Sequence, residues 1–171
     1  MTIETVPAQA TATHGTFTLE RTYPFDRATV FGAWATRNAK SQWFGEGDDF
    51  LAQTERYELD FRVGGREINR VGPKGGPVHA YDARYMDIVP NQRIVFGYDM
   101  HLDDTRISVS LATVEFAPAG AGTRLSFTEQ VVFLDGYDDP AGREHGTRIG
   151  LAKLDAALRR ETRAGAGMTP K

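Results

Sequence analysis

The sequence predicts a single α+β domain in which a long C-terminal helix packs across a curved antiparallel sheet and encloses an apolar cavity. Three observations indicate this class. A half-buried strand begins near Thr16, alternating strands fill residues 56 to 133, and a long helix with a leucine stripe follows Asp139. With 171 residues, 40% of them hydrophobic, the chain can bury one sizeable core.

Composition narrows the classes of function. The formal net charge is -3, and both signs are scattered along the chain, so no basic patch is available for nucleic acid. The absence of cysteine removes disulfides and thiolate chemistry, which is typical of the cytoplasm, where we expect this protein. Residues 1–15 lack the apolar run of a signal peptide. No segment approaches the ~18 apolar residues of a membrane span, so we expect no membrane insertion.

The N-terminal part is expected to order from Thr16 onward. Residues 1–15 are rich in Thr, Ala and Pro without periodicity, which favours a disordered leader. Beyond them, Phe17, Leu19 and Tyr23 alternate with polar residues, as in a strand with one buried face.

Two short helices are expected after this first strand. Asp26 is placed to cap the first helix, in which Val30, Phe31 and Trp34 recur at helical spacing. A second helix should run from Asn38, as its cap, to Phe44, with Gly45 as its left-handed exit.

The middle of the chain reads as a meander of strands, which gives an antiparallel sheet of about seven strands with the first strand included. The expected strands are 57–63, 66–71, 78–89, 92–100, 106–116 and 123–133. In the fifth of these, Ile107, Val109 and Leu111 share one face. Val114 takes the other face, which predicts a bulge near Ala112 that bends the strand.

The C-terminal helix is expected to begin with Asp139 as cap and to end near residue 162, so that the domain spans 16–162 and a disordered tail spans 163–171. Its apolar stripe consists of three leucines, Leu151, Leu154 and Leu158. Gly146 and Gly150 lie one turn apart, and they either let the helix approach the sheet closely or leave volume empty.

Several motifs occur in the order found in one known family. They are LERTYPFDRATVFGAW, QWFG, ELDFRVGG, YMDIVPNQRIVF and GTRLSFTEQ followed by FLDGYDD. From residue 16 to about residue 160 the chain resembles the heat-shock protein 90 ATPase activator-like (AHSA-type) branch of the START and polyketide cyclase-like (SRPBCC) superfamily. The resemblance implies a helix-grip fold with a cavity between sheet and C-terminal helix. It also leaves open a homodimer formed through an exposed edge such as 57–63.

The sequence departs from this family pattern at two places. Arg37-Asn38 replaces a common Asp-Pro, and Thr147 follows Gly146 where Trp is common. The second change removes a large side chain near the expected cavity.

Glu129 is the residue that stands out chemically. It occupies the middle of an apolar strand face formed by Leu125, Phe127, Val131 and Phe133, where an unpaired carboxylate would be costly. The implied fold places the first strand beside this one, so we expect Arg21 to form an ion pair with Glu129. That pair is either a structural bridge or a ligand anchor with acid-base capacity, and Glu129 and Arg21 are therefore the candidate catalytic residues.

The candidate ligand-binding residues combine aromatic side chains with a few polar groups, as ligand pockets do. They are Trp34, Trp43, Phe61, Tyr81, Tyr85, Phe96, Tyr98, Glu129, Phe133, His145 and Ile149. No histidine pair has metal-ligand spacing and no nucleotide-binding motif occurs, so neither a metal nor a cofactor is expected.

These observations favour a binding protein for a small hydrophobic or amphipathic ligand such as a lipid, an aromatic metabolite or a polyketide-like compound. A cofactor-free enzyme of cyclase, hydratase or hydrolase type, using one acid-base group, is the first alternative. A module that docks on a chaperone or another protein partner in a stress response is the second, and it rests on analogy alone.

Overall fold

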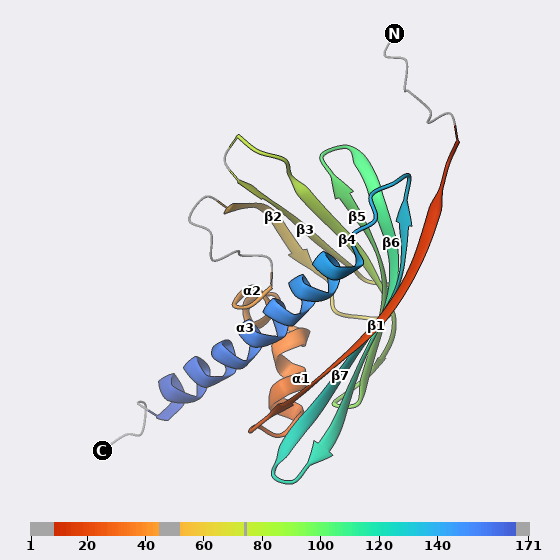
Figure 1. Cartoon of the computed structure of the whole chain (residues 1–171). Coiled ribbons are helices and arrows are strands. Elements are labelled where there is room, and N and C mark those ends of the chain that lie inside the picture. Colours follow the sequence, from red (N-terminus) through yellow and green to blue (C-terminus); the bar gives the residue numbers. More distant parts are fainter. Residues whose placement is uncertain (1–8, 45–51, 74, 167–171) are drawn as a thin grey trace.

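The computed structural model describes residues 9–44, 52–73 and 75–166, which form one curved sheet and three helices (Figure 1). In chain order the elements are β1 (Ala12–Tyr23), α1 (Arg27–Ala35), α2 (Arg37–Ser41), β2 (Ala52–Leu59), β3 (Arg66–Pro73), β4 (His79–Val89), β5 (Arg93–Leu102), β6 (Thr105–Ala119), β7 (Gly122–Leu134) and α3 (Pro140–Ala166). This order confirms the α+β class.

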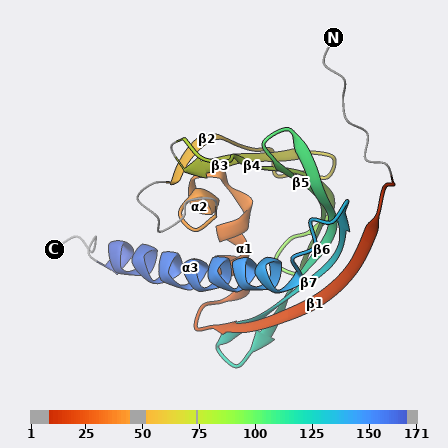
Figure 2. The ribbon, with the colours of Figure 1, turned by 45° about the horizontal axis from the view of Figure 1, so that its top comes forward.

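The seven strands are all antiparallel to their neighbours and lie in the order β1-β7-β6-β5-β4-β3-β2. Helices α1 and α2 carry the chain from β1 at one edge of the sheet to β2 at the other. Figure 2 shows the sheet curving around the helices, with α3 lying across its concave side. The predicted helix-grip fold is confirmed.

Some element boundaries differ from those expected. Strand β1 begins at Ala12, because residues 12–15 continue the pairing with β7, so these four residues are not part of a leader. Strand β2 ends at Leu59, which places Phe61 beyond it. Helix α3 continues to Ala166, past the expected end near residue 162. Residues 1–8 and 167–171, also assigned to leader and tail, lie outside the described residues.

The predicted bulge near Ala112 is wrong. The register between β6 and β7 is continuous from Ser108 to Ala119, and the irregularity between β5 and β6 lies instead at Met100/His101. Without a bulge, the apolar side chains of Val109 and Leu111 lie on the exposed outer face. The inner, buried face of this part of β6 carries serines, Ser108 and Ser110.

The helix caps agree with the sequence at two of three places. Asp26 accepts a 2.8 Å hydrogen bond from the Thr29 amide, and Asp139 accepts a 3.0 Å bond from the Gly142 amide. The second helix is capped by Thr36 rather than by Asn38, because its hydroxyl already accepts from the Ala39 amide at 3.2 Å. The expected exit at Gly45 lies outside the described residues.

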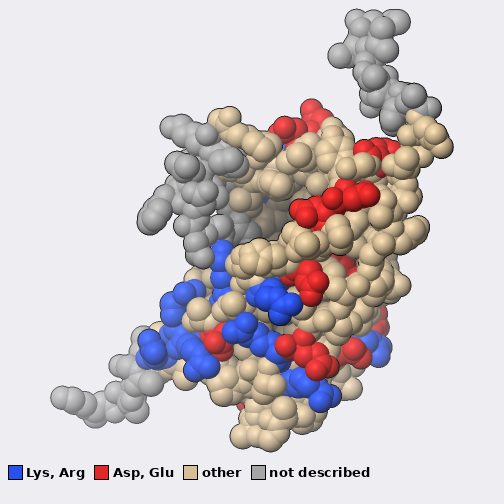
Figure 3. All heavy atoms as spheres, in the orientation of Figure 1, with Lys and Arg blue, Asp and Glu red and all other residues tan. Residues whose placement is uncertain are grey.

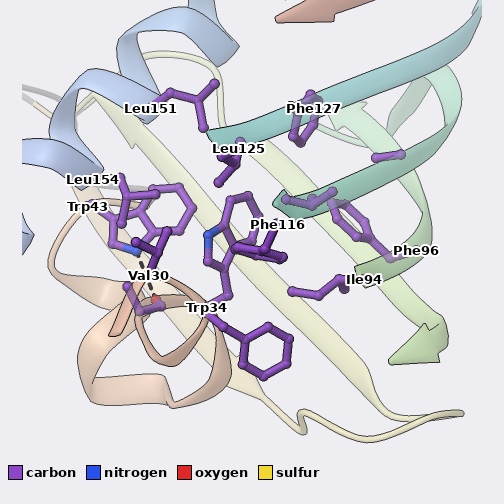
Figure 4. Packing of buried hydrophobic residues seen from close by; sticks show 14 of the residues in the cluster. Val30, Trp34, Trp43, Ile94, Phe96, Phe116, Leu125, Phe127, Leu151 and Leu154 are labelled. Carbon is purple, nitrogen blue, oxygen red and sulfur yellow. Dashed lines mark hydrogen bonds between the residues drawn. The ribbon is translucent and has the colours of Figure 1, made fainter. Parts of the chain in front are cut away.

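The leucine stripe of α3 packs into the main core, as predicted. Leu151, Leu154 and Leu158 are buried, and Figure 4 shows Leu151 and Leu154 facing Trp43 and side chains of the sheet. The Tyr23 hydroxyl donates a 2.9 Å hydrogen bond to the Leu151 carbonyl, which ties β1 to the middle of α3. The C-terminal half of the helix is thereby fixed to the sheet.

A buried ion pair attaches α2 to β3. Lys40 Nζ lies 2.6 Å from Glu67 Oε1, and both side chains are almost fully buried. Three hydroxyls also donate to the Glu67 carboxylate, those of Tyr57 at 2.7 Å, Tyr85 at 2.9 Å and Tyr81 at 3.5 Å. Burial raises the pKa of each tyrosine, so the hydroxyls stay protonated and can donate.

Aromatic rings surround the ammonium group of Lys40. Its Nζ lies 4.7 Å from the ring centroid of Phe44 and 5.2 Å from that of Trp34. Burial lowers the pKa of Lys40, whereas the Glu67 charge raises it. The pair was not predicted, because Lys40 has no apolar-face pattern in the sequence.

Replacing Leu154 by alanine should lower the free energy of unfolding by about 2–5 kcal/mol, since the side chain is fully buried and the core cannot collapse around the cavity left behind. Urea denaturation followed by tryptophan fluorescence measures the change. Ile149→Ala on the same helix is the control, because Ile149 is 42% exposed, and it should cost less than about 1 kcal/mol. Equal losses for both variants would contradict the placement of the leucine stripe.

Replacing Lys40 by methionine should cost about 3–5 kcal/mol, because the Glu67 carboxylate is then buried without its cation. The double variant Lys40→Met/Glu67→Gln should lose less than Lys40→Met alone, which urea denaturation of both variants tests. Arg66→Met, which breaks the exposed Arg66–Asp82 pair, should leave stability nearly unchanged. A double variant that loses more stability than Lys40→Met alone would contradict the interaction between the two side chains.

Candidate functional site

A cavity of about 630 Å³ lies between the concave face of the sheet and α3. Eight of the candidate ligand-binding residues line it: Trp34, Trp43, Tyr81, Phe96, Tyr98, Glu129, Phe133 and Ile149. Three candidates do not line it. Tyr85 is buried beside Glu67, Phe61 packs edge-on against Phe31, and His145 is exposed on α3.

Glycines of α3 create part of the cavity. Gly142, Gly146 and Gly150 all line it, and a Cβ atom added at Gly146 or Gly150 would meet no atom within 4 Å. Of the two roles that the sequence left open, these two glycines therefore leave volume empty. Tyr137 and Ile149 also line the cavity and are largely exposed, so they lie where it meets solvent.

Glu129 is fully buried in the wall of this cavity, on the inner face of β7. Its Oε1 atom accepts three hydrogen bonds, from Tyr98 at 2.6 Å, from Ser110 at 2.7 Å and from Arg143 at 2.9 Å. Its Oε2 atom has no hydrogen-bond partner among the described residues. The carboxylate is thus held by three hydrogen bonds at Oε1, whereas Oε2 makes none with the described residues.

Arg143, in the first turns of α3, supplies the positive charge opposite Glu129. Its side chain is 13% exposed, and its second terminal nitrogen donates a 2.6 Å hydrogen bond to Ser108. Its guanidinium carbon lies 5.6 Å from the ring centroid of Tyr98 and 5.5 Å from that of Phe133. Burial and the Glu129 charge raise the pKa of Tyr98, so its hydroxyl remains a donor.

The predicted ion pair between Arg21 and Glu129 is wrong. Arg21 lies opposite Leu125 in the β1–β7 register, whereas Glu129 lies opposite Phe17, four residues or about 13 Å farther along the strand. Arg21 instead approaches Asp155 on α3 at 3.9 Å, at a partly exposed position. Arg21 does not line the cavity.

Three buried side-chain polar atoms in the described part of the chain have no hydrogen-bond partner: Trp34 Nε1, Asn69 Oδ1 and Glu129 Oε2. All three residues line the cavity. Because buried polar groups are nearly always paired, these three atoms distinguish the wall of this cavity from the rest of the described interior. By contrast, the indole nitrogen of Trp43 donates to the Ala33 carbonyl at 2.9 Å, as the dashed line in Figure 4 shows.

The sequence did not identify Lys40, Asn69 or Arg143 as cavity residues. Ser110 had a detectable signal, since it alternates with Val109 and Leu111, but the apolar members of that pattern were assigned to the inside. Ser110 lies on the strand next to Glu129 and on the same face of the sheet. Because Glu129 is buried, Ser110 must also face inward, which turns Val109 and Leu111 outward.

Other kinds of site find little support in the described residues. Among them, no three His, Asp or Glu side chains converge as metal ligands would. No helix in these ranges is long and apolar enough to cross a membrane. Figure 3 shows both signs of charge on the face that carries α3, where Arg148 pairs with Glu144 and Arg159 with Asp155.

Comparisons with known proteins agree with this architecture. A family model described as activator of Hsp90 ATPase homolog 1-like protein matches residues 24–159. A protein structure from Rhizobium leguminosarum is 49% identical, with a TM-score of 0.84 over 89% of this chain and 99% of that chain. One from Rhizobium loti is 46% identical, with a TM-score of 0.80 over 86% of this chain and 99% of that chain.

More distant structures share the fold. An AHSA1-like protein from Aeromonas hydrophila is 18% identical, with a TM-score of 0.64 over 92% of this chain and 99% of that chain. A search of curated proteins gave no match. The family match covers most of the chain, and the chain therefore belongs to the family of activator of Hsp90 ATPase homolog 1-like proteins.

Proposed function

We propose that this protein binds a small, mainly apolar molecule in the cavity between its sheet and α3, and that Glu129 anchors a polar group of that molecule. The observation that carries the proposal is the buried carboxylate in the cavity wall with one oxygen fully partnered and the other unpartnered. An unpartnered buried acceptor costs about 1–3 kcal/mol or more. A ligand that donates to it would recover that cost.

The size and lining of the cavity support the same function. Its volume of about 630 Å³ is within the range of about 300–1,000 Å³ that is typical of small-molecule sites. Aromatic side chains supply much of the wall, among them Trp34, Trp43, Phe96 and Phe133. Such a surface favours a flat or aliphatic body with a small number of polar groups.

A cofactor-free enzyme is the second candidate, and the same free oxygen favours it. Glu129 Oε2 could exchange a proton with a bound molecule, and the neighbouring Tyr98 hydroxyl and Arg143 could stabilise developing negative charge. We rank it below simple binding because Tyr98 and Arg143 already donate to Glu129 itself. Docking on a chaperone, which the family description suggests, ranks third because it rests on analogy.

The protein should bind the neutral fluorophore N-phenyl-1-naphthylamine with one site per chain. Trp34 and Trp43 are the two tryptophans of the sequence and both line the cavity, so their emission should fall as the probe's emission rises. Excess probe should also raise the melting temperature, since a ligand at 100 times its Kd adds about 2.7 kcal/mol to stability.

Gly150→Phe should weaken this binding at least tenfold, roughly the effect of filling part of the cavity with an aromatic ring. Gly165→Phe is the matched control. It makes the same change on the same helix, also in open space, but Gly165 does not line the cavity. If the probe gives no saturable signal, or if both variants bind it equally, ligand binding in this cavity is disproved.

A further inference from the structure

We propose that the unpartnered oxygen of Glu129 makes the cavity selective for neutral ligands that carry a hydroxyl group, above all hydroxylated aromatic compounds, over carboxylates and over ethers of the same shape. This inference rests on the proposed binding function and goes beyond it by naming the chemical class of the ligand. It follows from the hydrogen-bond donors and acceptors that surround Glu129.

Only one of the two oxygens of Glu129 receives hydrogen bonds from the described residues. The three donors at Oε1, from Tyr98, Ser110 and Arg143, lie at 2.6–2.9 Å and occupy that oxygen fully. Oε2 belongs to the same fully buried carboxylate and receives no hydrogen bond from the residues that the structure describes. The polar group missing at this end of the cavity is therefore a hydrogen-bond donor.

The terminal nitrogens of Arg143, the cation that faces Glu129, already make hydrogen bonds. One terminal nitrogen of Arg143 donates to Glu129, to Tyr98 and to Ser110, and the other donates to Ser108. An incoming carboxylate would have to displace these oxygens or place its own charge beside Glu129. In a buried site such like-charge contact is strongly unfavourable.

The buried charges of the cavity also balance in pairs. Arg143 faces Glu129 at 2.9 Å, and Lys40, which is fully buried in the wall, faces Glu67 at 2.6 Å. Glu67 differs from Glu129 because both of its oxygens accept hydrogen bonds from the protein. A neutral ligand preserves this balance, whereas an anion would add a charge that neither of these two pairs neutralises.

The surroundings of Glu129 favour an aromatic body for the ligand. Phe127, two residues before Glu129, and Phe133, four residues after it, share the inner face of β7, and all three residues line the cavity together with Phe96. A ring carrying its hydroxyl at the edge would direct the O–H group toward the Glu129 carboxylate while its faces contact these side chains.

Three compounds of one shape test the inference: 2-naphthol, 2-methoxynaphthalene and 2-naphthoate. Their affinities for the wild-type protein are measured at neutral pH by displacement of N-phenyl-1-naphthylamine. We expect 2-naphthol to bind at least tenfold more tightly than either of the others, roughly the effect of one hydrogen bond to a charged acceptor. Equal binding of all three would overturn the selectivity but leave the binding function intact, whereas binding of none would overturn the binding function itself.

Glu129→Gln gives the sharper result, because it should abolish the preference for the hydroxyl compound over the ether. The three donors should hold the amide oxygen at the position of Oε1, so the amide NH₂ group replaces Oε2 and offers a donor where an acceptor stood. 2-Naphthol should then lose its advantage over 2-methoxynaphthalene, because the oxygen of either compound can accept from the amide. An unchanged order in a folded variant would show that Glu129 does not set the preference.

Two further variants complete the test. Glu115→Gln changes the net charge equally at an exposed position of β6, and it should keep the wild-type order of affinities. Glu129→Asp keeps the charge opposite Arg143, so it protects the fold if the glutamine variant is unstable. Because it withdraws the carboxylate by one methylene group, it should reduce the preference for 2-naphthol, and an undiminished preference would overturn the assignment to Glu129.

Discussion

The hydrogen-bonded ion pair between Arg143 and Glu129 joins the N-terminal half of α3 to the sheet across the cavity. The C-terminal half of the helix needs no such contact, since Leu154 and Leu158 are buried in the main core. Gly146 and Gly150, by contrast, contribute no side chain to fill the space beneath the first half. The polar contact therefore spans a region in which apolar packing is absent, and the cavity can exist without detaching the helix.

Two buried carboxylates organise the interior in different ways. Glu67 is surrounded by Lys40 and tyrosine hydroxyls, so its role is to fix α2 against the sheet. Glu129 has a comparable shell at one oxygen only. The two shells are adjacent, because the rings of Tyr81 and Tyr98, one from each shell, lie 4.7 Å apart. A substitution at one carboxylate can therefore affect the hydrogen bonds of the other through the contact between these two rings.

The fold could be predicted from the sequence to a large extent because its signals are local. Alternation in β7, the Asp26 and Asp139 caps and the leucines of α3 each depend on residues close in the chain. The burial of Glu129 followed from the same alternation. Its partner did not, because pairing depends on the register between β1 and β7 and on how far α3 reaches over the sheet.

The cavity was predicted better in its aromatic lining than in its polar groups. Large aromatic residues were selected because ligand pockets are mainly apolar and aromatic. Lys40 carries no signal in its own neighbourhood, and the alternation that contains Ser110 was assigned to the wrong face. The orientation of β6 was predicted wrongly, because the exposed apolar side chains of Val109 and Leu111 resemble a core-facing pattern. In this part of β6 the residues that face inward are serines that hydrogen-bond to β7 and α3, rather than the apolar residues.

The spacing of glycines on α3 has a consequence for how members of this fold can diverge. Gly142 is constrained, because a side chain there would collide with the Asp139 carboxylate that caps the helix. Gly146 and Gly150 face open space and have no such restriction. Exchanges at these two positions would alter the volume and shape of the cavity while the sheet, the caps and the leucine core stay as they are. During evolution, substitutions in α3 alone can therefore change the size and shape of the cavity while the rest of the fold is unchanged.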